Sequence, residues 1–278
     1  MWSRAEAKEY EHRLLDKSAG RYTIDDALDR WEAQYVPRLR SHKQIIEHMR
    51  ALRAFTADKT LHEAVNAATA LKLASTALAP ATINQRLAVL RRVLSLAFKE
   101  WDWLHEDLAR KVSLLPVHNE RHVYLTRSQV EALAAACSNR DAKDLIVLAA
   151  FTGLRLSELF RARSTDVWQG CLRLDARTKN SRPRSIPLHP RALAIAQRLP
   201  LGITRVTLRQ EWVRARRKCA LEHVHFHDLR HTFASWCLAA GARLPELKEL
   251  MGHQTIEMTM RYAHLTPNAT RTIIEKIG

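Results

Sequence analysis

Three short segments carry residue types that could act together on a phosphate group. Residues 151–159 (FTGLRLSEL) hold an arginine and a glutamate, residues 227–236 (HDLRHTFASW) hold His-x-x-Arg, and residues 251–265 (MGHQTIEMTMRYAHL) hold Gly-His and a later tyrosine. Arginine suits phosphate because its planar guanidinium is always charged and can donate to two oxygens at once. Lysine or histidine can protonate a leaving oxygen, and tyrosine can attack as a nucleophile. Such a set could cut and rejoin a phosphodiester through a phosphotyrosine.

The histidines of HDLRH also match a different kind of site. His227 and His231 are four residues apart, so on a helix they share one face, as zinc ligands often do. However, Asp228 stands where the metalloprotease pattern has glutamate, and no third ligand follows at metzincin spacing. The four cysteines include no C-x-x-C pair, which argues against a thiolate zinc site and for a reduced compartment. We therefore expect no metal, with a zinc hydrolase as the alternative.

The charge of the chain indicates a polyanionic partner. The formal net charge is +16, of which residues 1–120 carry +3 and residues 121–278 carry +13. A strongly basic globular protein usually binds nucleic acid. The densest basic runs lie at residues 177–184 and 214–218. Either run could be a solvated surface or a DNA-facing one, and the overall charge favours DNA.

Several other functional classes are excluded by missing patterns. The sequence contains neither the G-x-x-x-x-G-K-[ST] nor the G-x-G-x-x-G phosphate-binding motif, so we expect no nucleotide cofactor. The apolar stretches at residues 145–154 and 231–242 are shorter than the ~20 residues that cross a bilayer. The first residues are charged throughout and lack the apolar core of a signal peptide. We expect a cytoplasmic protein without a membrane partner.

The first half of the chain predicts a helical bundle. Thr23 and Asp26 resemble a capping box at the start of a helix. Within residues 82–100 the apolar residues recur at helical spacing, at Ile83, Leu87, Leu90, Leu94 and Ala97. We expect a short N-terminal extension, a helical domain and a linker at residues 1–20, 21–110 and 111–122.

The second half predicts helices around a small sheet. Thr126 and Gln129 form a capping box, and Gly241 suits the end of the helix that holds HDLRH. Between them, residues 165–188 read as short strands separated by turn-prone residues. The expected fold is mainly α, with an N-terminal helical bundle and an α+β second domain over residues 123–278 that contains a small antiparallel sheet.

The order and context of the three motifs resemble the tyrosine recombinases, the phage-integrase family. The resemblance covers residues 123–265, and the preceding bundle fits that family's core-binding domain less distinctively. It implies that Arg155 and Arg230 clamp the scissile phosphate of DNA. It also implies that Tyr262 is the nucleophile and forms a 3′-phosphotyrosyl intermediate.

The same resemblance implies supporting roles. Lys179, before the SIPL strand, would be the general acid toward the 5′-hydroxyl leaving group. His227 and His253 would hydrogen-bond the phosphate or assist proton transfer. Glu158 would orient its neighbours. The apparent zinc spacing is then a coincidence, and His231 is expected to pack or hydrogen-bond structurally.

Each of these residues also has an ordinary structural interpretation when it is taken alone. Arg155 and Glu158 could form a surface ion pair along a helix. Tyr262 could be a half-buried core tyrosine, and Lys179 a solvated loop lysine. Basic residues outside the motifs are candidates for contacts with DNA phosphates, and we expect them at Arg86, Arg91, Arg92, Arg177, Arg182, Arg184, Arg214, Arg217 and Lys218.

The resemblance therefore predicts a site-specific DNA recombinase, first of the phage or prophage integrase type. The expected partners are double-stranded DNA with a specific core site, a homo-tetramer on that DNA, and DNA-bending or excision accessory proteins. The extension before the bundle is too short for the arm-site-binding domain of some phage integrases, so the enzyme acts without one or the chain is truncated. Alternatives are an Xer-like chromosome dimer resolution recombinase, a catalytically inactive DNA-binding regulator and a type IB topoisomerase.

Overall fold

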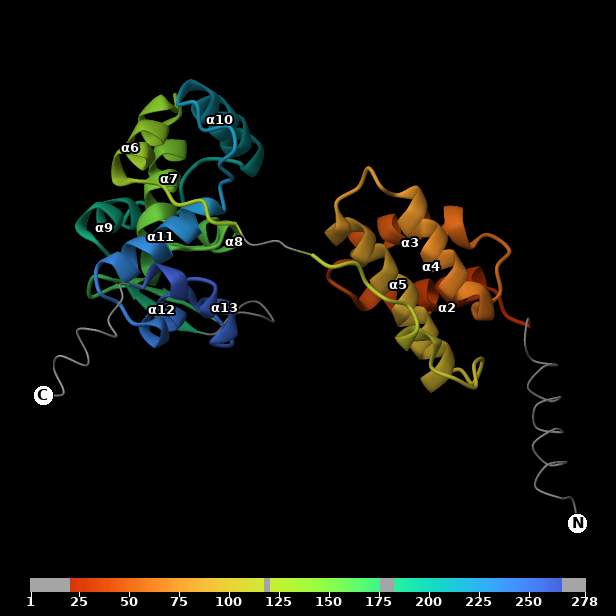
Figure 1. Ribbon diagram of the computed structural model, residues 1–278. Coiled ribbons are helices and arrows are strands. Elements are labelled where there is room, and N and C mark those ends of the chain that lie inside the picture. The colour runs from red at the N-terminus through yellow and green to blue at the C-terminus, as the bar shows by residue number, and fades with distance from the viewer. Residues whose placement is uncertain (1–20, 118–120, 176–182, 267–278) are drawn as a thin grey trace, which may run out of the picture. The chain divides into compact units, whose positions relative to one another are not determined.

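The computed structural model describes residues 21–117, 121–175 and 183–266, and the chain divides into two compact units. The first unit is Met1–Asn119 and the second is Glu120–Gly278 (Figure 1). Each has its own core of buried apolar residues. The fold is mainly helical with a small antiparallel sheet, which confirms the predicted fold class.

The first unit is a helical bundle built around its longest helix, α5. Thr23 caps the first described helix with a complete capping box, as predicted. The predicted apolar stripe of α5 is fully buried, because Leu87, Leu90 and Leu94 expose none of their surface. The elements are α2 (Ile24–Gln34), η1 (Val36–Arg38), α3 (His42–Thr56), η2 (Leu61–Glu63), α4 (Ala64–Ala74), α5 (Pro80–Lys99) and η3 (Leu108–Arg110).

The segment after η3 packs on the bundle. Val112 is buried in the core of the first unit. The side-chain amide of Asn84, on α5, donates to the carbonyl of Leu115 and accepts from its N–H at 2.9 and 2.8 Å. Residues 111–115, which the sequence placed in a linker, are thus attached to the first unit by a buried apolar side chain and by hydrogen bonds to α5.

The second unit surrounds α11 with other helices and a sheet. In Figure 1, α11 lies beside α7 and α12, and these helices are in contact. The helices and turns are α6 (Arg127–Ala136), α7 (Arg140–Thr152), α8 (Leu156–Leu159), η4 (Ser164–Asp166), α9 (Pro190–Ala196), α10 (Arg205–Lys218), α11 (Asp228–Ala239), α12 (Leu244–Met251), α13 (Glu257–Met260) and η5 (Ala263–Leu265). Among the described residues, no helix is both long enough and apolar enough to cross a membrane.

The predicted sheet is present within the described part of the second unit. Its strands are β1 (Val167–Trp168), β2 (Cys171–Leu174) and β3 (Arg184–Pro187), paired antiparallel in the order β1-β2-β3. Leu172 pairs with Ile186, and both side chains are buried in the core of this unit. The sheet therefore fixes the start of β3, where Arg184 lies.

Candidate active site

Arg155 and Glu158 are positioned by the N-terminus of α8. Arg155 is the N-cap residue, and its backbone N–H donates to Glu158 Oε2 at 2.8 Å. Its guanidinium also pairs with Glu158 Oε1 at 3.3 Å, while 30% of the side chain stays exposed. The predicted pair therefore exists, but it is not an ordinary surface pair, because Glu158 is only 5% exposed. Arg155 keeps N–H groups that can reach an incoming anion.

Glu158 is shared with a second arginine, Arg184. The guanidinium of Arg184 donates to both carboxylate oxygens of Glu158, at 3.1 and 2.9 Å, and its Nε donates to the carbonyl of Leu250 at 3.1 Å. Its side chain is only 6% exposed. Arg184, which was predicted to contact DNA, is thus buried and paired with a carboxylate in this structure, unlike a free surface cation. The antiparallel register of β3 points this arginine inward, where it anchors Glu158.

Burial alone would raise the pKa of Glu158. The hydrogen bonds and charge of Arg184, together with those of Arg155, outweigh burial and hold the pKa of this carboxyl below its ordinary value. Glu158 is thus ionised at neutral pH and fixes the orientation of both arginines. This geometry fits the orienting role expected for Glu158.

Arg230 is held by the C-terminal ends of two helices. Its Nη1 donates to the carbonyl of Gly153, at the end of α7, and its Nη2 donates to the carbonyl of Met251, at the end of α12, at 2.5 Å. Carbonyls at helix C-termini carry partial negative charge and lack helical partners, so they suit a cation. The side chain is buried, and its other N–H groups do not bind these two carbonyls. Arg230 is thus fixed in position before any ligand arrives.

Two glycines make this arrangement possible. Gly153 and Gly252 both have positive φ, at 63° and 62°, and each ends a helix whose carbonyl binds Arg230. A Cβ on Gly153 would clash with the ring of Phe233 at Cδ1, and a Cβ on Gly252 would lie 2.5 Å from Nη1 of Arg184. Glycine is therefore required at both positions for backbone conformation and for space.

The site concentrates more positive than negative charge. Burial, followed by the charges of Arg155 and Arg184, lowers the pKa of Arg230 to about 9, while the charge of Glu158 opposes them. Arg230 stays a cation at neutral pH. One carboxylate cannot neutralise three guanidinium groups, so the site favours an added anion such as a phosphate.

His253 is a buried, neutral histidine beside the arginines. Its Nδ1 lies 2.9 Å from the hydroxyl of Thr259. Burial, followed by the charges of Arg230 and Arg155, lowers the pKa of His253 to about 3. A neutral imidazole whose Nδ1 is engaged with Thr259 has Nε2 available to donate to, or accept from, a bound phosphate.

Tyr262 lies in a small apolar cluster just after α13. It packs with Phe233, Leu238, Leu247 and Met251 and is 2% exposed. Burial raises the pKa of its phenol to about 12, against the opposing charges of Arg230 and Arg261. Its ring is parallel to that of His253, with centroids 6.5 Å apart. The tyrosine is therefore placed next to the arginine site in a protonated form.

The two histidines of HDLRH do share one face of α11. The rings of His227 and His231 meet edge to face, with centroids 5.2 Å apart. His231 turns its Nδ1 to the hydroxyl of Tyr262 at 2.6 Å, and His227 stays exposed at the start of the helix. Burial and the charge of Arg230 lower the pKa of His227, so it is mainly neutral at pH 7. Among the described residues, no group of three or more metal-ligating side chains is present.

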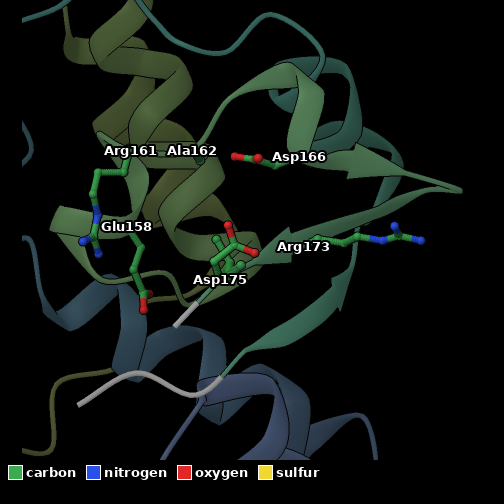
Figure 2. Close-up of a pocket in the computed structure, with 7 residues that line it drawn as sticks. Glu158, Arg161, Ala162, Asp166, Arg173 and Asp175 are labelled. Atoms are coloured by element: carbon green, nitrogen blue, oxygen red, sulfur yellow. The ribbon is translucent and has the colours of Figure 1, made fainter. Parts of the chain in front are cut away.

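Two hollows border this region. A cleft of about 600 Å³ is lined by Arg184, Lys248, Gly252 and His253, among other residues, and gives His253 an open side. A smaller pocket of about 30 Å³ lies between α8 and β2, with Glu158 and Arg161 on one side and Arg173 and Asp175 on the other (Figure 2). The smaller pocket holds about one water, so only the cleft could admit a larger group.

These features coincide with matches to known proteins. Residues 201–269 match the model of the phage integrase family. The integrase of Haemophilus phage HP1 (strain HP1c1) is 30% identical over 207 residues, which cover 70% of this chain and 59% of that protein. The chain belongs to the tyrosine recombinase family of phage integrases. It spans little more than half the length of the phage integrases that it matches.

Two further matches compare this phage-integrase family member with a different kind of recombinase and with a solved structure. The tyrosine recombinase XerC of Staphylococcus epidermidis is 26% identical over 225 residues, which cover 69% of this chain and 73% of that protein. A solved structure of a lambda integrase (75-356) dimer bound to a COC′ core site matches with a TM-score of 0.69 at 19% identity, and covers 85% of this chain and 97% of that one. The latter match supports the fold alone.

The other predicted residues of this phage-integrase family member belong to the first unit, to α10 or to segments outside the described residues. Lys179, Arg177 and Arg182 lie outside them. On α5, Arg92 is exposed while Arg86 and Arg91 are half-buried, and all three belong to the first unit. The three predicted cations on α10 are all exposed, and they are Arg214, paired with Glu211 at 2.5 Å, together with Arg217 and Lys218.

Two residues near the tyrosine received no functional role from the sequence. His231 was expected to pack or hydrogen-bond structurally, and it does hydrogen-bond, with the hydroxyl of Tyr262 as its partner. Arg261 is exposed beside the tyrosine, and its charge lowers the pKa of both Tyr262 and His253. The sequence could have pointed to Arg261, because it is a cation directly before Tyr262. The contact of His231 is revealed only by the packing of α11 against the α13 region.

Proposed function

We propose that this chain is a site-specific DNA recombinase of the phage-integrase type, which cuts and rejoins DNA strands through a 3′-phosphotyrosyl intermediate. One observation carries the proposal: a surplus of fixed guanidinium charge lies beside a buried, protonated tyrosine. Arg230 is held by two helix ends and Arg155 by Glu158, so both are oriented before DNA binds. Preorganised donors of this kind stabilise the charge of a pentavalent phosphate.

The remaining roles follow from the chemistry that the reaction requires. Arg155 and Arg230 clamp the non-bridging oxygens, and His227 and His253 hydrogen-bond the phosphate. Tyr262 attacks phosphorus, and Lys179 protonates the departing 5′ oxygen. Because a phosphodiester is exchanged for a phosphotyrosine of similar energy, the bond energy is stored for rejoining. No nucleotide cofactor is then needed.

The basic second unit and the arginines of α5 would both bind the duplex. Exchange between two duplexes cuts four strands, so we propose a homo-tetramer on a specific core site, with DNA-bending or excision proteins setting direction. The solved lambda integrase dimer on its core site supports DNA binding by this fold. Sequence-independent affinity should fall steeply with salt. We place the reaction in the cytoplasm.

A recombinase that resolves chromosome dimers is the second candidate. The XerC match favours it, because the alignment covers 73% of that protein, a larger share than for the phage integrases. The two candidates differ in substrate. An integrase joins an attachment site on one DNA to a site on another, whereas a dimer-resolving enzyme recombines two copies of one site.

Covalent capture tests the function. Nicked duplexes from the DNA that flanks the gene would be incubated with the chain and a chelator, then denatured. We expect a denaturation-resistant adduct with the wild type and none with Tyr262→Phe. Tight binding without any adduct, across all of these fragments, would support the inactive regulator instead. Relaxation of supercoils without site preference would support a type IB topoisomerase, and an activity lost on chelation would support a zinc hydrolase.

A further inference from the structure

His231 and Tyr262 form a buried pair that the roles above do not use. The imidazole Nδ1 lies 2.6 Å from the phenol oxygen, and the ring centroids are 5.8 Å apart. His231 is 8% exposed and Tyr262 is 2% exposed, so water has little access to this bond. A short bond between two buried groups fixes the nucleophile in one rotamer and defines where its proton points.

The proton of this bond sits on the tyrosine. Burial, followed by the charge of His227 and then those of Arg261 and Arg230, lowers the pKa of His231 to about 4, although Asp228 opposes them. The imidazole is therefore neutral at pH 7. Burial raises the pKa of Tyr262 to about 12, so the phenol keeps its proton. Tyr262 donates and His231 accepts at Nδ1, which places the proton of His231 on Nε2.

We propose that His231 is the base that takes the phenolic proton when Tyr262 attacks phosphorus. This inference rests on the proposed recombinase function. As the bond from the phenol oxygen to phosphorus forms, the bond from phosphorus to the 5′ oxygen breaks. The phenolic proton moves to Nδ1 of His231, and the 5′ oxygen receives its own proton from the general acid. Rejoining reverses each transfer, and His231 returns the proton to the released phenol.

The surroundings explain why the base acts only on bound DNA. Without a phosphate, the charges of Arg230 and Arg261 disfavour a cationic His231, and burial keeps Tyr262 protonated although the same two charges oppose it. A phosphate between the arginines would offset those charges and make His231 a stronger base. Attack on phosphorus also makes the phenolic proton more acidic. Both changes favour transfer at the moment of reaction.

The other histidines of the site are less suited to this task. The Nδ1 of His253 is engaged with Thr259, and its ring lies parallel to that of Tyr262 rather than edge-on to the hydroxyl. His227 is exposed at the start of α11 and meets His231 edge to face. Both are better placed to contact a phosphate, so His231 is left as the acceptor for the nucleophile.

The test compares the rate of adduct formation with and without a proton acceptor at position 231. In His231→Asn, the amide oxygen can still accept a hydrogen bond near the position of Nδ1 but cannot take a proton. We expect adduct formation to slow roughly 100-fold or more, in line with general-base catalysis, with unchanged affinity for DNA. His223→Asn, at an exposed histidine of the same segment, is the control and should react like the wild type.

Difluorotyrosine at position 262 separates a base from a structural residue. Its more acidic phenol needs less help from a base, so it should restore most of the rate lost in His231→Asn and change the wild-type rate little. Equal effects in both backgrounds would overturn the proposal. A duplex with a 5′-bridging sulfur, which leaves without protonation, should not rescue His231→Asn. Rescue by this duplex would place His231 at the leaving group and also overturn the proposal.

A DNA-free measurement distinguishes this inference from the proposed function. The fluorine resonance of difluorotyrosine at 262 should shift, and titrate at a different pH, in His231→Asn. If it does so while the wild type forms no adduct on any duplex, the contact exists but the recombinase function fails, and the base role fails with it. If the resonance is unchanged and His231→Asn forms adduct at the wild-type rate, the base role fails while the recombinase function stands.

Discussion

The two units of this chain bury different kinds of side chains. Among the described residues, the buried polar side chains of the first unit are Thr56 and Ser75, which carry no charge. The second unit buries carboxylates, an arginine and histidines, namely Glu158, Glu211, Asp228, Arg230, His231 and His253. Burying a charge costs free energy unless it is paired and hydrogen-bonded. The second unit therefore departs from a purely apolar core, and all of these residues except Glu211 lie at or next to the proposed site.

This contrast distinguishes residues that stabilise the fold by apolar packing from residues that orient a charged side chain. The first unit can be described by apolar periodicity, since the stripe of α5 fills its core. In the second unit, helix ends and carboxylates orient cations, and glycines make room for them. Violations of the simple burial pattern tend to mark functional sites. Substitutions in the two units should accordingly have different signatures.

The largest effect is expected from Arg230→Lys. A single ammonium cannot span the carbonyls of Gly153 and Met251 and still present donors to a phosphate. We expect the rate of adduct formation per bound protein to fall by roughly 1000-fold, as for the loss of a preorganised donor. The matched variant Arg50→Lys, at an exposed arginine of α3 that has no proposed contact with DNA, should keep the wild-type rate. A wild-type rate in Arg230→Lys would show that the guanidinium of Arg230 is not needed for adduct formation.

Leu87→Ala should destabilise the first unit by about 4 kcal/mol, because it leaves a cavity in a fully buried core. Hydrogen exchange of α5 peptides measures this loss and should find it constant between pH 5 and 8, since no charge is involved. Peptides of α7 and α8 should be unaffected. A strong dependence on pH in this range would contradict the description of the first unit as an apolar core.

Glu158→Gln should cost the second unit about 3 kcal/mol at pH 7, because buried Arg184 loses its charged partner. The lowered pKa of Glu158 stabilises the fold above the ordinary value of 4.5, and this stabilisation is lost as the pH falls through the lowered pKa. The difference from the wild type should therefore be constant above pH 5 and shrink below 4.5. Urea unfolding followed by hydrogen exchange of α8 peptides measures it, and a difference that does not shrink as the pH falls below 4.5 would contradict the ion-pair account.

The smallest effect is expected from Gly252→Ala compared with Gly170→Ala. Both glycines have positive φ, so both substitutions carry the same backbone strain. Only the Cβ at 252 meets Arg184, whereas nothing lies within 4 Å of one at 170. We expect an additional loss of about 1–2 kcal/mol at 252 from overpacking, together with slower adduct formation. Thermal unfolding of the two variants measures the difference. Equal losses of stability would show that the side chain of Arg184 moves aside without a cost in free energy.

Much of this molecule can be predicted from its sequence, for reasons that differ by element. The capping box of Thr23 and the stripe of α5 are local patterns, and both are confirmed. The strands around residues 165–188 are also local and confirmed. The motif order points to the arginines and the tyrosine because it matches a family, and the spacing of HDLRH alone would equally well suggest zinc.

What the sequence could not show depends on long-range packing. Arg184 looks like one more basic residue of a charged run, and only the register of β3 turns it onto Glu158. His231 looks structural, and only the approach of Tyr262 to α11 shows that its partner is the proposed nucleophile. Neither contact has a signature within a few residues of sequence. The carbonyls that hold Arg230 are backbone groups, which sequence motifs do not encode.

The central claim is that Tyr262 forms the covalent bond to DNA. The most direct test digests the captured adduct with protease and nuclease and identifies the nucleotide-linked peptide by mass spectrometry. The account predicts a single modified peptide that contains Tyr262, linked through a 3′-phosphate. A nucleotide on another residue, such as nearby Tyr124, or a linkage through the 5′-phosphate would contradict it.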